Sequence, residues 1–65
     1  MSIQAIVVTR VKRDTTIKQL IPVKNLGEVT TREEGDFWCK YFDGAEMRSM
    51  IIEESPQEVA DLCNK

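Results

Sequence analysis

Histidine is absent from this sequence, and only two cysteines are present. Histidine is the commonest general acid–base in enzymes and a frequent zinc ligand, so its absence removes the usual route to catalysis and to a metal site. Cys39 and Cys63 lie far apart and form no C-x-x-C pair, the spacing typical of metal-binding or redox cysteines. We therefore expect no metal, no cofactor and no enzymatic activity.

We also expect no secretory signal, because no basic N-terminal segment of the sequence leads into a long apolar run. We expect a cytoplasmic protein (in the host cytoplasm if a phage encodes it), where cysteines stay reduced. Cys39 and Cys63 are then two small, buried apolar residues. A disulfide between them would need the C-terminal helix to pack over the strand that carries Cys39.

Long hydrophobic runs are missing, and no segment reaches the 18 or so apolar residues that predict a transmembrane helix. The 65 residues make a single domain over 1–65 with no room for a second. A core of this size supplies only roughly 3–5 kcal/mol, so small domains often depend on a disulfide, a metal or a partner. We expect self-association or a protein partner to supply the additional stability.

Acidic residues are scarce in the first half of the chain and basic residues in the second half. The first 32 residues carry six basic and two acidic groups, whereas the remaining 33 carry three and nine. This asymmetry favours head-to-tail contacts between copies, or a basic patch for an anionic partner. It is also what two ordinary solvated surfaces would show.

The first half of the chain predicts strands joined by turns. Residues 2–11 are rich in β-branched side chains, with apolar residues at odd and even positions, which is typical of a central strand covered on both faces. Residues 12–14 predict a turn. The alternation over 17–23 predicts a second strand, which Pro22 places at an edge because proline has no N–H to donate.

The middle of the chain continues that strand and then turns. Gly27 predicts a bulge or bend, after which residues 28–32 extend the edge strand. Residues 33–36 contain the second turn signal.

Residues 36–52 predict the clearest hairpin. A three-residue loop over 42–44, with Gly44 in the left-handed conformation, places Trp38 opposite Arg48. A two-residue turn would mix charged and apolar side chains on each face, so we favour the three-residue loop. One face then holds Phe37, Cys39, Tyr41, Met47 and Ile51. The other holds Trp38, Lys40, Phe42, Glu46, Arg48, Met50 and Ile52.

The chain ends in a predicted helix. Ser55 is the N-cap, Pro56 the first helical residue, and Glu58 completes a capping box. Glu53 and Glu54 lie just before the helix, where negative charge complements its dipole. A short helix is marginal alone in water, so its apolar stripe must dock on the sheet. The stripe consists of Val59, Leu62 and Cys63.

The fold class that follows is α+β. We predict a small, twisted antiparallel β-meander of four or five strands, with a barrel-like form as one version, and one short C-terminal helix. The acids around Ser55 are the only grouping that suggests catalysis, and each already has a structural explanation. Ser55 caps the helix, and Glu53 and Glu54, as strand neighbours, point to opposite faces. We predict no catalytic residues.

The predicted hairpin offers a surface for a protein partner. Aromatic residues, methionine and arginine are enriched in interface cores, and one predicted face combines them. The candidate partner-binding residues are Trp38, Lys40, Phe42, Arg48 and Met50. One small helix cannot cover both faces of the sheet, so part of this surface is expected to stay open to a partner or a second copy.

Nucleic-acid or anion binding is the alternative. Arg10, Lys12 and Arg13 form a short basic tract at a turn, and the aromatic residues of the hairpin offer stacking groups. The domain as a whole is acidic, unlike most nucleic-acid binders. A further alternative is an oligomer that holds a small anionic ligand between subunits.

The second half of the chain resembles the C-terminal portion of the flagellar FlbD-type small proteins, and many short bacterial and phage proteins. The shared features are an Asn/Asp-Gly turn, an apolar strand, and a capped helix. The matching positions are Asp43, Gly44, Ile51, Ile52, Glu54, Ser55, Glu58, Val59 and Leu62. This resemblance covers roughly the last 25 residues of the sequence. It implies a fold rather than an activity.

The predicted function is a non-enzymatic regulatory or inhibitory protein-interaction module of bacterial or phage origin. We expect it to act by binding a partner protein and to form a homo-oligomer, without contact with a membrane.

Overall fold

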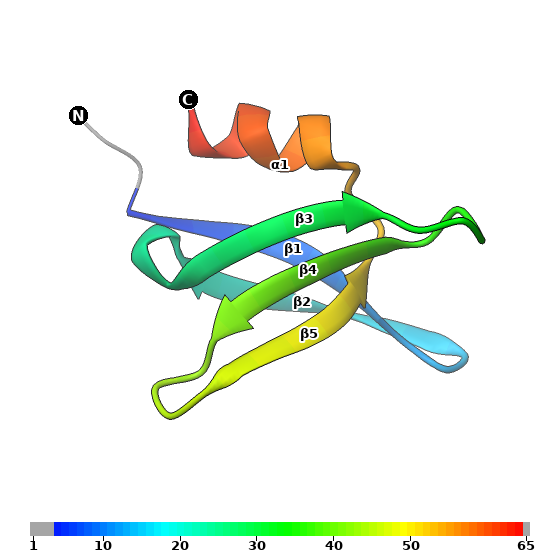
Figure 1. The fold of residues 1–65 in the computed structure, drawn as a ribbon, viewed down its shortest axis with the longest axis horizontal. Helices are drawn as coiled ribbons and strands as arrows, with labels where there is room; N and C mark the ends of the chain where they lie inside the picture. Colours follow the sequence, from blue (N-terminus) through cyan, green and yellow to red (C-terminus); the bar gives the residue numbers. More distant parts are fainter. Residues whose placement is uncertain (1–3, 65) are drawn as a thin grey trace.

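The computed structural model describes residues 4–64 and contains five strands and one helix (Figure 1). Most of the chain is therefore strand, as the β-branched composition predicts. The elements in chain order are β1 (Ala5–Lys12), β2 (Thr15–Pro22), the 3-10 turn η1 (Val23–Asn25), β3 (Leu26–Thr31), β4 (Phe37–Phe42), β5 (Met47–Ile52) and α1 (Pro56–Cys63).

The strands form one open antiparallel sheet in the order β2-β1-β5-β4-β3. β1 and β2 make one hairpin, and β3, β4 and β5 make a meander. The two units join through β1 and β5, whose ladder consists of the single pair Arg10–Ile52. The predicted α+β class is confirmed, with five strands and one short C-terminal helix.

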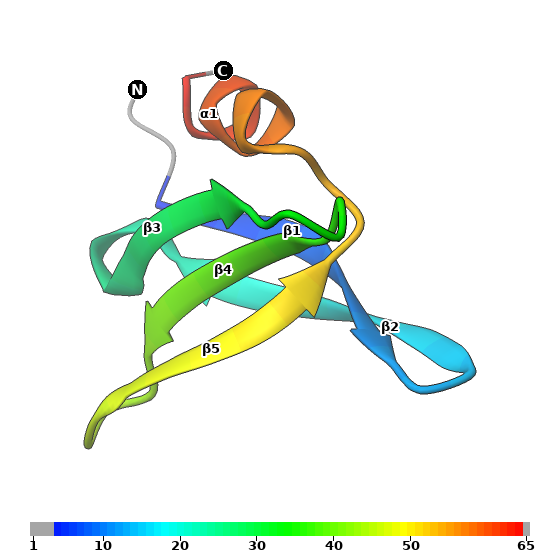
Figure 2. The ribbon, with the colours of Figure 1, turned by 45° about the vertical axis from the view of Figure 1, so that its right-hand side comes forward.

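The core lies between the two strand units, because β1 and β2 cross behind β3, β4 and β5 (Figures 1 and 2). Both units and the helix contribute buried side chains. The helix contacts β1 and β3, which are not neighbours in the sheet. The buried apolar residues are Ile6, Val8, Ile21, Cys39, Met50, Ile52 and Val59.

β1 occupies an interior position in the sheet, as predicted, but it is not covered on both faces. Ile6 and Val8 are buried, whereas Val7 between them is 49% exposed. The side of the strand that carries Val7 is open at Val7 and covered only at Thr9, which is buried under Glu54, so apolar residues at both parities do not mean double coverage along the whole strand. Residues 2 and 3 of the expected strand lie outside the described residues.

Pro22 ends β2 at an edge of the sheet, which confirms the position that its missing N–H predicts. The prediction that residues 28–32 extend the same strand is wrong. The turn η1 reverses the chain after Pro22, and β3 pairs with β4 at the opposite edge. The bulge expected at Gly27 is present as a register shift between Leu26 and Val29.

The predicted register of the β4–β5 hairpin is wrong. Phe42 pairs with Met47, so four residues and not three separate the strands, and Trp38 lies opposite Ile51 rather than Arg48. The slip is by an odd number of positions, which exchanges the faces of β5 relative to β4. Met50 and Ile52 therefore join the core.

The helix follows the prediction closely. The Glu58 N–H donates to Ser55 Oγ (3.2 Å) and the Ser55 N–H donates to Glu58 Oε1 (3.2 Å), which completes the capping box. Val59 is buried in the core. Leu62 and Cys63 pack against the core from the same side of the helix.

Cys39 is fully buried and Cys63 half-buried, and both are free thiols. Of the helices in the described part of the chain, none has the length and apolar character needed to cross a membrane.

Candidate protein-binding surface

One face of β4 and β5 is turned away from the core and toward solvent (Figures 1 and 2). Residues directly opposite each other in an antiparallel pair share a face, so the register defines its membership. We call this surface the outer face. It consists of Trp38, Lys40, Phe42, Met47, Ser49 and Ile51. Within residues 4–64, α1 packs on β1 and β3, and no element lies over the outer face.

Large apolar side chains are accessible on the outer face. Phe42 is 40% exposed and Met47, its cross-strand partner, is 54% exposed. Gly27 on β3 leaves room for Met47, because a Cβ there would lie 3.0 Å from the Met47 Cε. Trp38 is half-buried, and the guanidinium of Arg32 lies over its ring at 4.3 Å from the centroid. This contact is a cation–π interaction.

Two of the five predicted partner-binding residues are not on the outer face. Met50 lies opposite Cys39 and is buried in the core. Arg48 lies opposite Tyr41, and its guanidinium turns to Asp43 rather than to Trp38. Arg48 and Met50 leave the outer face because the loop has four residues and not the predicted three. The longer loop shifts β5 by an odd number of positions, so Met47, Ser49 and Ile51 lie opposite the outer-face residues of β4. Trp38, Lys40 and Phe42 do share one face, and Met47 and Ile51 complete its apolar row.

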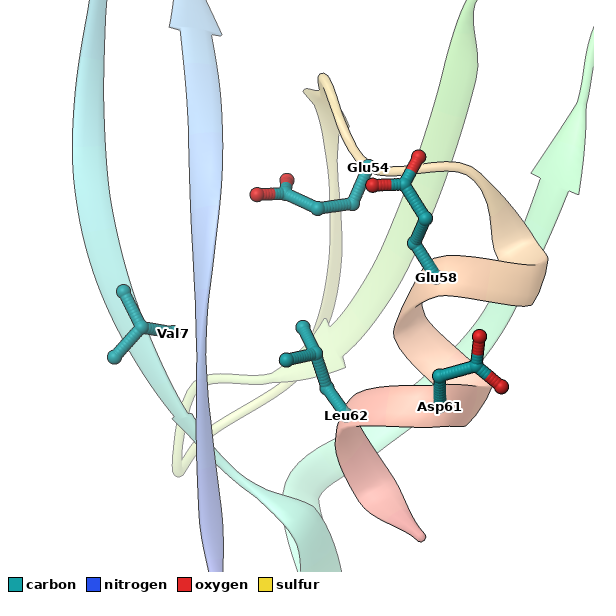
Figure 3. Close-up of a pocket in the computed structure, with 5 residues that line it drawn as sticks. All are labelled: Val7, Glu54, Glu58, Asp61 and Leu62. Atoms are coloured by element: carbon teal, nitrogen blue, oxygen red, sulfur yellow. The ribbon is translucent and has the colours of Figure 1, made fainter. Parts of the chain in front are cut away.

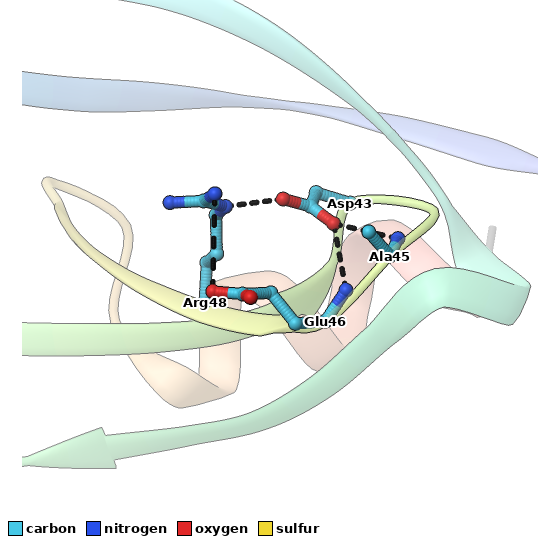
Figure 4. Close-up of polar contacts among 4 residues, drawn as sticks. All are labelled: Asp43, Ala45, Glu46 and Arg48. Carbon is cyan, nitrogen blue, oxygen red and sulfur yellow. Dashed lines mark hydrogen bonds and ion pairs between the residues drawn. The ribbon is translucent and has the colours of Figure 1, made fainter.

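Asp43 organises the loop between β4 and β5 (Figure 4). Its Oδ1 accepts hydrogen bonds from the N–H groups of Ala45 (2.8 Å) and Glu46 (2.9 Å), and its Oδ2 accepts one from Arg48. The Glu46 hydrogen bond, followed by the Arg48 and Ala45 hydrogen bonds, lowers the pKa of Asp43 to about 2. A side chain that caps its own turn in this way is typical of aspartate. The prediction from the sequence placed Asp43 in the loop but did not include this role.

The three residues of the alternative site lie on the β1–β2 hairpin. Lys12 and Arg13 are exposed at its turn, while Arg10 is half-buried and donates to Gln19 Oε1 at 3.2 Å. The stacking candidates are on β4, which β5 separates from β1. Trp38 and Tyr41 occupy opposite faces of that strand. The structure does not gather the basic tract and the aromatic groups on one surface.

Glu54 joins the end of β5 to β1. Its Oε1 accepts from the Thr9 N–H (2.8 Å) and its Oε2 from the Thr9 hydroxyl (2.9 Å), while Lys18 Nζ donates to Thr9 Oγ1 (2.7 Å). The Glu53 N–H also donates to the Thr9 carbonyl at 3.0 Å. The assignment of Glu54 to the helix dipole is therefore incomplete, because its carboxylate is directed at Thr9.

A shallow cleft of about 370 Å³ lies beside the helix (Figure 3). Its lining combines the side chains of Val7 and Leu62 with the carboxylates of Glu54, Glu58 and Asp61. Glu54 accepts hydrogen bonds from Thr9, Glu58 closes the capping box, and Asp61 Oδ1 accepts from Gln57 Nε2 (3.0 Å), so all three acids already have hydrogen-bond partners. Among residues 4–64, no three cysteine, aspartate or glutamate side chains are arranged to hold a metal ion.

The fold and this surface define a small α+β protein with an open antiparallel sheet and one exposed apolar face. No family model, curated protein or solved structure matches the chain. The resemblance of the C-terminal part to FlbD-type proteins stays a prediction.

Proposed function

We propose that this protein is a non-enzymatic protein-interaction module that acts by binding a partner protein through the outer face. A regulatory or inhibitory action by surface occlusion, in a bacterium or phage, is the form that we favour. The observation that carries the proposal is the uncovered apolar row on β4 and β5, with Phe42 and Met47 at its most exposed end. Exposed apolar patches that polar residues surround mark interaction sites on soluble proteins.

The composition of the outer face supports this reading. Tryptophan, phenylalanine and methionine are enriched at interface cores, and rigid aromatic side chains lose little entropy on binding. Lys40 and Ser49 lie opposite each other between the Phe42–Met47 and Trp38–Ile51 pairs and supply polar contacts. Self-association through the same face would bury it equally, so the module is proposed to form homo-oligomers when no partner is present.

A test would charge the outer face without touching the core. The variant Met47→Lys with Ser49→Lys changes two exposed side chains of β5 and should keep the far-ultraviolet circular dichroism of the wild type. Affinity capture from the native host, followed by mass spectrometry, should recover a specific protein with the wild type and lose it with the variant. Light scattering would report self-association in parallel.

The matched control adds the same two charges elsewhere. Ala60→Lys with Asn64→Lys places them on the exposed side and end of α1, and this variant should retain the partner. A partner that binds both variants equally would refute the outer face as the binding surface. Loss of the folded state in the outer-face variant would show that this row is core.

A further inference from the structure

The two edges of the sheet differ in how they are protected. β3 is short, carries a bulge between Leu26 and Val29, and lies under α1. β2 has eight residues in continuous register with β1, from Thr15 opposite Lys12 to Pro22 opposite Ala5, and pairs with no other strand of the described chain. Bulges and covering helices prevent strand addition, and β2 has neither. Its protections are Pro22 at the end of the strand and Lys18, whose ammonium turns to Thr9 on β1. Its backbone groups on the free side are a template for another strand.

Apolar side chains flank the free edge of β2 on both sides. Ile17 is 42% exposed and Leu20 is 65% exposed, and a separation of three residues puts them on opposite faces of the strand. Beside Leu20 lies a hollow of about 320 Å³ that reaches Tyr41 and Phe42 at the end of β4. A strand that adds to β2 crosses this hollow and can place one large apolar side chain in it.

The charge of the β1–β2 hairpin selects among possible strands. The hairpin, residues 5–22, has a net charge of +3, because it contains four basic residues and one acid, Asp14. The basic residues are Arg10, Lys12, Arg13 and Lys18. Antiparallel pairing with β2 of a second copy would bring two such hairpins together, and like charges across a strand pair are destabilising. Lys18 directs its ammonium at Thr9 on β1, away from the free edge, so the exposed cations left for an incoming acidic segment are Lys12 and Arg13 at the turn.

We propose that the free edge of β2 binds an extended, acidic segment of a partner protein by strand addition, with an apolar side chain of that segment in the hollow beside Leu20. This inference rests on the proposed protein-binding function and specifies the chemistry of the partner. Main-chain hydrogen bonds would supply affinity, and the hollow and the basic hairpin would supply specificity.

The test uses a fluorescein-labelled heptapeptide, Glu-Val-Glu-Phe-Glu-Val-Glu, titrated into the full chain with fluorescence anisotropy. The wild type should bind it saturably, and binding should weaken as salt is added. A peptide with lysine in place of glutamate, and one with alternate backbone amides methylated, should not bind. The variant Leu20→Lys removes the apolar contact beside the hollow and should weaken binding by about tenfold or more. Ile17 lies on the opposite face of β2, next to the glutamates of the bound peptide, so Ile17→Lys should not weaken binding.

Ala60→Lys is the matched control, with the same charge added on exposed α1, and it should bind as the wild type does. Because Ile17 and Leu20 are exposed, both variants should melt within a few degrees of the wild type. Amide hydrogen exchange should slow along 15–21 when the peptide is added. Equal binding by the wild type and Leu20→Lys would overturn the proposal, as would protection confined to β4 and β5.

Two further outcomes separate this proposal from the proposed function. If the captured partner binds through the outer face while the acidic peptide shows no binding, strand addition at β2 is wrong and the protein-binding function stands. If Leu20→Lys converts a wild-type oligomer to a monomer and no peptide binds, the edge pairs with a second copy, which also overturns the proposal.

Discussion

Removal of the Glu54 carboxylate should destabilise the protein more than any other single change to an acidic side chain. Thr9 is buried, and Glu54 accepts both its N–H and its hydroxyl hydrogen. In Glu54→Ala the Thr9 N–H loses its partner inside the protein. Leaving a buried donor unpaired costs about 1–3 kcal/mol, and hydrogen bonds to a charged acceptor are in the upper part of that range.

The magnitude is large for so small a domain. A loss of about 2–3 kcal/mol would remove about half of a stability of roughly 3–5 kcal/mol. Each kcal/mol lowers the melting temperature of a domain of this size by about 4–8 °C. Thermal unfolding followed by circular dichroism should therefore show Glu54→Ala melting roughly 10–20 °C below the wild type.

Glu53→Ala is the control for this measurement. Glu53 is the adjacent acid and is exposed, and its contact with Thr9 is made by the backbone N–H, which alanine keeps. Its free energy of unfolding should stay within about 0.5 kcal/mol of the wild type. If both variants lost the same stability, the effect would come from negative charge near the helix and not from the Thr9 hydrogen bonds.

Three further predictions follow from the hairpin loop, the bulge and the thiols. Because the folded-state pKa of Asp43 is lowered to about 2, its contribution to stability is present above pH of about 4 and is lost as the pH falls toward 2. The melting-temperature difference between the wild type and Asp43→Asn should shrink over that range, and a constant difference would contradict this prediction. Gly27→Ala should cost about 1–3 kcal/mol in denaturant unfolding, because the new Cβ would lie 3.0 Å from the Lys40 carbonyl oxygen; an unchanged midpoint would show that β3 can shift. Cys39 is buried, and burial raises the pKa of its thiol. Iodoacetamide should therefore label Cys63 in the native protein and Cys39 only after denaturation, as measured by peptide mass spectrometry. Equal labelling of both thiols would refute the burial of Cys39.

The parts of the fold that local chemistry determines could be predicted from the sequence. Ser55, Pro56 and Glu58 specify the start of the helix within four residues, so no distant contact is needed to place it. Pro22 specifies an edge for a similar reason, because a missing N–H restricts a strand wherever the sheet lies. The fold class follows from such local signals together.

The register of β4 and β5 could not be predicted in the same way. Both parities of β4 are apolar except at Lys40, so a shift by an odd number of residues leaves two apolar faces and the pattern does not select between them. What selects is the loop, where Asp43 binds the N–H groups two and three residues ahead and makes a four-residue connection. The partner-binding prediction depended on the register, which is why Arg48 and Met50 were assigned to the wrong face.

The link between Glu54 and Thr9 depends on contacts distant in sequence. The two residues are 45 positions apart, and nothing near either one indicates the other. Beside a helix N-terminus, an acid has a sufficient local explanation in the dipole. The contact of Glu54 with Thr9 depends on the three-dimensional fold, in which β1 lies beside the end of β5.

The single ladder pair between β1 and β5 has a consequence for the order of folding. Each hairpin is closed by a short turn and can form from local contacts, but the pair Arg10–Ile52 closes a loop that includes most of the chain. Loop-closure entropy opposes that step until the core contacts of both units are in place. The joint around Thr9 and Glu54 should therefore form late, and substitutions there should mainly accelerate unfolding and have little effect on the folding rate.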